Sequence, residues 1–220
     1  MSRLLPILYN TPMVEALLAG NKTQTRRIVK AGNHTVIRGG TFPGALDGPK
    51  YGAELDNHGV LVAPYQVGDI LWVRETWAAF RGWCWGPVYV YKAGYDPKQL
   101  PPGYITKWHW HPSIHMPKEA ARLFHRVTNV RVEHLQDITI QGLQAEGFLP
   151  SGFVSQYAAM TSDCFERFQM LWDKTIKPAD RDRCGWDANP WVWVYSFDRY
   201  DDLEEIADMV HRDRAKERAI

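Results

Sequence analysis

The sequence contains few cysteines, no excess charge of either sign and no long apolar run. Its three cysteines, Cys84, Cys164 and Cys184, are far apart and form no CxxC pair, which argues against a disulfide framework or a zinc knuckle and favours a reducing compartment. Lysine and arginine together number 26, against 25 acidic residues, so any contact with nucleic acid has to be local. No apolar run approaches the roughly 20 residues that span a bilayer.

Several common enzyme signatures are also missing. No GxGxxG follows a predicted strand, and there is no Walker A, HExxH or GxSxG sequence, which disfavours dehydrogenases, P-loop NTPases, zincins and α/β-hydrolases. The opening MSRLLPILYN is short and interrupted by Pro6, unlike a signal peptide. We therefore expect a cytoplasmic protein that uses no cofactor and does not interact with a membrane.

Strands separated by long excursions, with helices between them, predict an α+β protein built on a mixed or barrel-like sheet. A helix begins near Thr11, the predicted N-cap, and Gly20 ends it. Runs of alternating residues predict strands at residues 22–29, 70–77, 87–95, 122–134 and 190–197. Between the last two, a short helix capped by Asp137 ends at Gly147, and a stronger helix covers about 162–175.

Two irregular stretches, 31–66 and 96–117, are predicted to be long insertions, which in a compact domain are usually functional. We expect one domain over residues 1–198, followed by a charged helical C-terminal tail over 199–220. The ten tryptophans suit either a core or stacking surfaces for bases.

The stretch GNKTQTRR, residues 20–27, concentrates cations and hydroxyls. A desolvated Lys22 could remove the proton of Thr25 and make its hydroxyl a nucleophile. Strict strand alternation would put the two on opposite faces, so they converge only if the chain turns just after Gly20; a solvated turn is the alternative. Arg26 and Arg27 also point to opposite sides, so one of them could grip a phosphate or carboxylate.

Two glutamates are further candidates. Glu146 lies at the end of its predicted helix, where the helix dipole disfavours an ionised carboxylate by roughly 0.3–1 kcal/mol. A carboxyl group in that position suits general acid–base work, although an exposed surface glutamate is the simpler alternative. Glu75, within the sequence VRETW, is either a buried, paired carboxylate or a group facing a ligand.

Aromatic and imidazole side chains cluster between Trp108 and His115. The histidines could be metal ligands, but no acidic or cysteine partner lies at a recognisable spacing, so we expect no metal. Stacking on a flat ligand and simple packing both remain open for this cluster.

The opening helix followed by GNKTQTRR resembles the signature of the ASCH family, a branch of the PUA-like β-barrel superfamily. Gly20, Lys22, Thr25 and Arg27 match its pattern G-x-K-x-x-T-x-R. Gly68-Asp69, VRETW and PSIHMP are similar to segments of larger ASCH proteins of bacteria and phages, and DANPWVWVYSF fits the closing barrel strand. The resemblance implies a PUA-like β-barrel with flanking helices and two long loop insertions.

One ASCH subgroup comprises amidohydrolases that deacetylate N4-acetylcytidine, and the resemblance implies a similar set here. Lys22 and Thr25 match its N-terminal motif, and LQDITIQGLQAEG brings Glu146 onto its glutamate. The implied mechanism is acyl transfer, in which Lys22 activates Thr25 and Glu146 protonates the departing amine. The residues expected to bind the substrate, a modified nucleoside, are Arg26, Arg27, Glu75, Trp77, Trp108, Ser113 and His115.

Two other functions stay open at this point, because this chain is about twice as long as the compact amidohydrolases. A non-catalytic module that binds RNA or nucleotides would line a basic groove with Arg26, Arg27, Lys30 and Arg38. A ribonuclease would need the cluster from His109 to His115 close to Lys22.

Overall fold

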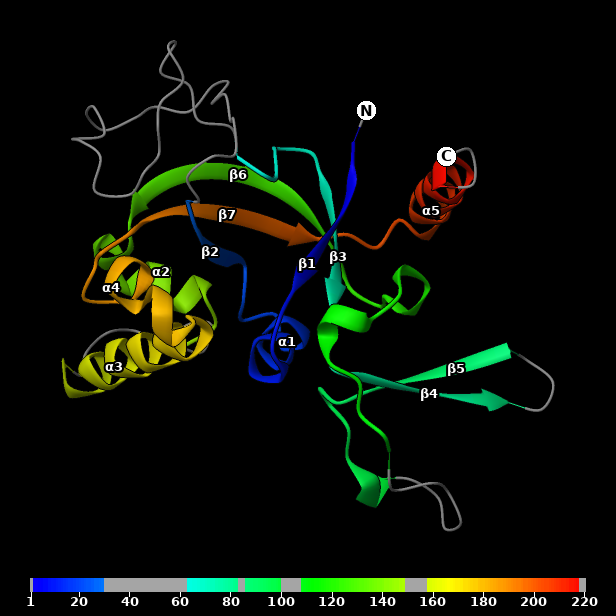
Figure 1. Cartoon of the computed structure of the whole chain (residues 1–220), viewed down its shortest axis with the longest axis horizontal. Coiled ribbons are helices and arrows are strands. Elements are labelled where there is room, and N and C mark those ends of the chain that lie inside the picture. The colour runs from blue at the N-terminus through cyan, green and yellow to red at the C-terminus, as the bar shows by residue number, and fades with distance from the viewer. Residues whose placement is uncertain (1, 30–62, 83–85, 100–107, 149–157, 218–220) are drawn as a thin grey trace. The chain divides into compact units, whose positions relative to one another are not determined.

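The computed structural model describes residues 2–29, 63–82, 86–99, 108–148 and 158–217, and the following concerns these residues (Figure 1). The chain divides into two compact units. Unit 1 comprises Met1–Ala19, Gly68–Arg126 and Asp198–Ile220, and unit 2 comprises Gly20–Val67 and Val127–Phe197. Each unit is described by itself.

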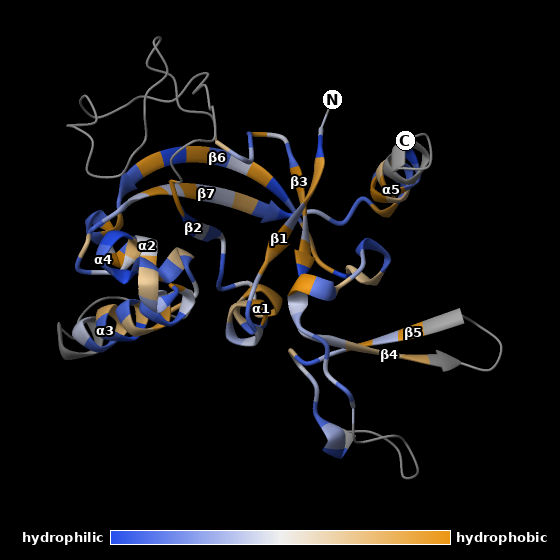
Figure 2. Ribbon diagram, viewed as in Figure 1, coloured by the Kyte–Doolittle hydropathy of each residue, from blue (hydrophilic) through white to orange (hydrophobic). Residues whose placement is uncertain are grey.

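Unit 1 is built on a mixed sheet. Its elements are β1 (Leu4–Leu8), α1 (Thr11–Leu18), β3 (Ile70–Arg74), β4 (Trp77–Gly82), β5 (Gly86–Tyr91), the start of β6 (Phe124–His134) and α5 (Leu203–Glu217). β1 pairs parallel with β3, and β3 pairs antiparallel with the start of β6. Apolar residues run along β1 and β3 in Figure 2, and β3 is buried on both faces up to Val73. The core therefore lies along β3.

Unit 2 carries an antiparallel sheet covered on one face by helices. Its elements are β2 (Gln24–Ile28), the rest of β6, α2 (Ile140–Ala145), α3 (Ala158–Thr175), α4 (Arg181–Cys184) and β7 (Trp191–Arg199). β7 pairs antiparallel with β2, and the strand order within this unit is β6-β7-β2. The core of this unit joins β7 to the helices and consists of Leu135, Ile138, Leu143, Cys164, Phe168, Trp172, Val192 and Val194.

The helix ends follow ordinary capping chemistry, with two corrections to the sequence prediction. Asn10, not Thr11, caps α1, and its side chain accepts a hydrogen bond from the Met13 amide. Thr139, not Asp137, caps α2. Its hydroxyl accepts a hydrogen bond from the Gly142 amide, three residues later in the chain. The predicted stops are confirmed: Gly20 and Gly147 have φ of +71° and +89°, a conformation that glycine adopts at little cost.

The predicted α+β class and mixed sheet are confirmed. The predicted strand 70–77 is interrupted, because β3 ends at Arg74 and β4 begins at Trp77 and pairs with β5 in a separate two-stranded sheet. Within the described residues, strand pairing does not close into a barrel. Most of the predicted insertion 31–66, including Arg38, lies outside the described residues, as do Lys30 and the middle of 96–117.

The C-terminal segment contributes to the core of unit 1. Ile206 and Met209 of α5 pack with Leu4, Ile70 and Trp72, while Leu203 is exposed. The predicted C-terminal helix is therefore present, and Ile206 and Met209 on its apolar side are buried. Among the described residues, no helix is long and apolar enough to cross a membrane.

Candidate functional site

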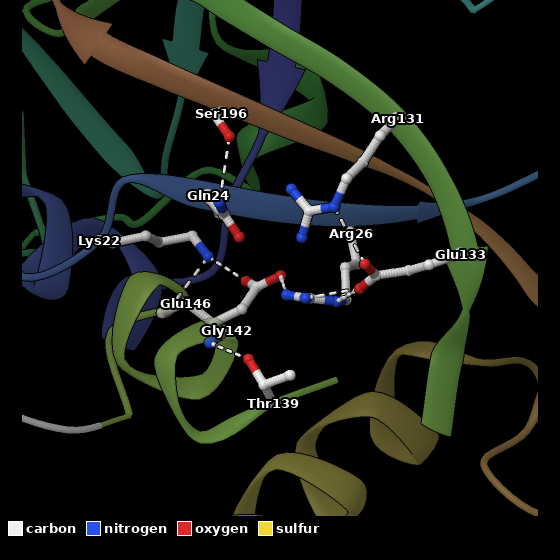
Figure 3. Close-up of polar contacts among 9 residues, drawn as sticks. All are labelled: Lys22, Gln24, Arg26, Arg131, Glu133, Thr139, Gly142, Glu146 and Ser196. Atoms are coloured by element: carbon white, nitrogen blue, oxygen red, sulfur yellow. Dashed lines mark hydrogen bonds and ion pairs between the residues drawn. The ribbon is translucent and has the colours of Figure 1, made fainter. Parts of the chain in front are cut away.

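The centre of the candidate site is a buried ion pair between Lys22 and Glu146 in unit 2 (Figure 3). The two residues form an isolated antiparallel bridge just before β2, so the backbone itself brings them together. The Lys22 ammonium contacts Glu146 Oε2 and donates to the Glu146 carbonyl oxygen at 3.2 Å. Their side chains are 0% and 3% exposed. The contact joins the N-terminal motif to a glutamate 124 positions later.

Further charged residues extend the pair into a chain of alternating sign, here called the charge chain. Arg26 donates to Glu146 Oε1 at 3.1 Å and to Glu133 Oε1 at 2.6 and 2.9 Å. Arg131 donates to the other oxygen of Glu133 at 3.1 Å. The chain therefore runs from the fully buried Lys22 to Arg131, which is 41% exposed. Both oxygens of the Glu146 carboxylate contact a cation.

Burial changes the acid–base character of Lys22. Loss of hydration lowers the pKa of its ammonium from the ordinary value of 10.5, and the charges of Arg27 and Arg26 lower it further. The negative charge of Glu146 raises the pKa and so offsets part of this lowering. A lysine in this environment gives up its proton more readily than an exposed one, as a general base requires. Glu146 is the C-cap of α2, as the helix-dipole argument assumed, and the two cations that contact its carboxylate offset the unfavourable interaction of a negative charge with the helix C-terminus.

Alternation along β2 separates the predicted residues onto two faces. Gln24 and Arg26 lie opposite Ser196 and Val194 of β7, on the face of the charge chain. Thr25 and Arg27 lie opposite Tyr195 and Trp193 on the other face. Thr25 is 1% exposed, and in the part of the chain that the structure describes no hydrogen bond joins its hydroxyl to Lys22 or Glu146.

The Thr25 face also carries two tyrosines that sequence reasoning missed. The rings of Tyr65 and Tyr195 meet edge to face at 5.1 Å. Burial raises the pKa of both phenols, and the Arg27 charge acts in the opposite direction on both. The alternation of the strand 190–197 could have indicated Tyr195, since it aligns with Thr25 once β2 and β7 are paired.

Glu75, predicted as either a paired or a ligand-facing carboxylate, is paired. It is 1% exposed and receives two hydrogen bonds from Arg122, at 2.8 and 2.9 Å. Arg122 also donates to the Ala93 carbonyl at 2.9 Å and lies 4.1 Å from the Tyr91 ring. This arrangement satisfies the carboxylate within unit 1 and gives Glu75 a structural role.

Four other predicted substrate-binding residues also belong to unit 1, namely Trp77, Trp108, Ser113 and His115, whereas Arg26 and Arg27 belong to unit 2 together with Lys22, Thr25 and Glu146. Trp77 pairs through its backbone with His111, and their rings are 5.0 Å apart. Trp108 donates to the Tyr95 hydroxyl at 2.8 Å. Ser113 and His115 bound a 3-10 turn and do not enter the core. Among the described residues, no group of three or more His, Cys, Asp or Glu side chains could hold a metal.

Arg131, Glu133 and Gln24 are site residues that the sequence analysis did not single out. A signal for the first two exists: they alternate along the predicted strand 122–134 and therefore share one face. Comparison with protein-family models, characterised proteins and solved structures gave no match. The function therefore has to be argued from the geometry of unit 2.

Because Gly142 has no side chain, the Arg26 guanidinium has room beside it. This close approach allows a first test of the charge chain. A Cβ at residue 142 would come within 2.9 Å of an Arg26 guanidinium nitrogen and 3.0 Å of the Ile138 side chain. We expect Gly142→Ala to destabilise the protein by about 1–2 kcal/mol, as overpacking does, despite the better helix propensity of alanine. Urea unfolding of the variant measures this, with Gln141→Ala at the exposed neighbour as control. Equal or greater stability than wild type would show that Arg26 is not held in place.

Proposed function

We propose that this protein is an amidohydrolase that removes the acyl group from a modified nucleoside such as N4-acetylcytidine. The observation that carries the proposal is the buried Lys22–Glu146 pair, which joins the two parts of the motif that resembles ASCH amidohydrolases. Buried titratable groups whose pKa is shifted by burial and by a specific partner cluster at catalytic sites. Both influences act on the pKa of Lys22: burial lowers it, and its partner Glu146 raises it in part.

In the proposed reaction, Lys22 in its neutral form accepts the proton of the Thr25 hydroxyl, and the Thr25 oxygen then attacks the acyl carbonyl carbon. The proton then passes to the departing amine, and water hydrolyses the acyl-threonine. Glu146 is held by Lys22 and Arg26, so its main effect is to position Lys22 and to stabilise the ammonium as it forms. Lys22 lies before the start of β2, and Arg26 and Arg27, on opposite faces of that strand, both lower the pKa of its ammonium.

The same resemblance supports a PUA-like β-barrel with two long insertions as the fold. The antiparallel pairing of β2, which carries the motif, with the last strand β7 is compatible with it. A cytoplasmic location stays a prediction from cysteine usage.

Removing the Thr25 hydroxyl is expected to lower turnover of N4-acetylcytidine at least 100-fold, within the range for loss of a catalytic group. Thr25→Val nearly keeps the volume of this buried side chain, so we expect it to fold, and Thr25→Ser keeps a hydroxyl and should retain activity. Lys22→Met and Glu146→Gln should lower turnover similarly. The assay is release of cytidine by purified protein, below the unfolding temperature of every variant.

Two results would contradict the proposal in different ways. Full activity of Thr25→Val would make water, activated by the Lys22–Glu146 pair, the nucleophile. No turnover by folded wild type would contradict the hydrolase proposal. The remaining candidate would then be a module that binds nucleotides or RNA, and its affinity should depend steeply on salt.

A further inference from the structure

Gln24 presents a buried hydrogen-bond acceptor at the start of β2. Its amide nitrogen donates to the Ser196 hydroxyl at 3.0 Å, which fixes the side chain. Its amide oxygen is buried and has no hydrogen-bond partner among the residues that the structure describes. In Figure 3 this oxygen points to the side on which Lys22 and Glu146 lie. A buried acceptor with no donor is costly, so such an atom calls for a partner.

The charges on this face determine which end of the amide belongs there. The charge chain holds three cations, Lys22, Arg26 and Arg131, against the two carboxylates of Glu133 and Glu146, so its net charge is positive. A net positive charge favours the amide oxygen over the NH2 group on this face, so exchanging the two ends of Gln24 is unfavourable. Lys22 and Arg26 also direct their donors to carboxylates. The missing donor is therefore expected from a bound molecule.

We propose that Gln24 recognises the substrate by accepting a hydrogen bond from its amide N–H. This inference rests on the proposed function and narrows it to secondary amides, in which the nitrogen still carries a hydrogen. Tertiary amides and esters lack that donor and leave the Gln24 oxygen unpaired. The bond orients the acylated amine in the site, so Gln24 determines specificity for the acylated exocyclic amine of a nucleobase.

Binding of two nucleosides tests the inference without requiring turnover. Cytidine, the product, carries the 4-amino donor, and the ribonucleoside of 2-pyrimidinone lacks only that group. Wild type should bind cytidine roughly 5- to 100-fold more tightly in calorimetry, the range for a buried acceptor left unpaired. Gln24→Leu should lose most of this preference, whereas Gln141→Leu, at an exposed residue of α2, should keep it.

Thermal melting establishes that each variant is folded, and Gln24→Met replaces Gln24→Leu if the latter is not. Equal affinity of wild type for the two nucleosides would overturn the inference, because the oxygen would then be satisfied by water. A preference that survives both Gln24 substitutions would also overturn it. Either result can accompany normal turnover of N4-acetylcytidine, which leaves the proposed function standing. If the protein neither binds the nucleosides nor turns over N4-acetylcytidine, both the proposed function and this inference are wrong.

Discussion

Replacing Arg122 by methionine is expected to destabilise the protein by about 3 kcal/mol. The substitution keeps an apolar stem but leaves the Glu75 carboxylate, 1% exposed, without its two charged hydrogen bonds. Breaking a buried pair from one side costs roughly 3–5 kcal/mol, because the remaining charge is uncompensated. Arg122 is 30% exposed, so water can reach part of the site and the lower end of that range applies. Chemical denaturation at pH 7 measures the loss.

Two matched variants isolate the cause of that loss. Arg199→Met removes a cation from an exposed pair with Asp201 and should cost less than about 1 kcal/mol. Combining Arg122→Met with Glu75→Gln removes the buried charge and should recover part of the stability. A loss for Arg122→Met no larger than that for Arg199→Met would show that Glu75 is hydrated rather than buried.

Local features of the fold could be predicted from the sequence, whereas strand partners could not. Alternation predicts strands at 122–134 and 190–197, and glycines mark the ends of α1 and α2. Both features depend only on residues that are neighbours in the sequence. The break between β3 and β4 could not be predicted. It depends on Trp77 pairing with β5 and His111 rather than on the apolar run itself.

The site shows the same division between local and long-range information. The motif at 20–27 indicated Lys22 and Arg26, and the end of α2 indicated Glu146, but Glu133 and Arg131, which complete the charge chain, lie on β6, more than 100 positions after Arg26. The alternation that the sequence analysis described places Thr25 and Arg26 on opposite faces of β2. Which of these faces carries Glu146 is decided by the position of α2, which alternation does not specify.

Replacing Glu146 by glutamine is expected to destabilise the protein by about 3–5 kcal/mol near neutral pH. The side chain keeps its volume, but Lys22 and Arg26, 0% and 1% exposed, lose the carboxylate that lies between them. Two cations then face each other across a neutral amide in a buried site, which is the costly way to break a buried pair. Glu166→Gln, at an exposed position of α3, is the matched control and should change stability by less than about 0.5 kcal/mol.

The pH dependence of this loss identifies Lys22 as its origin. Burial lowers the pKa of Lys22, and Glu146 offsets part of this effect. Removing the Glu146 charge therefore lowers the pKa of Lys22 further in the folded state. Between the folded pKa and 10.5 the unfolded chain binds more protons, and stability there rises with pH. The variant should therefore regain stability from a lower pH than wild type does, and the difference between them should shrink from pH 7 to pH 10. A difference that stays constant over this range would place the loss in packing rather than in the charge on Lys22.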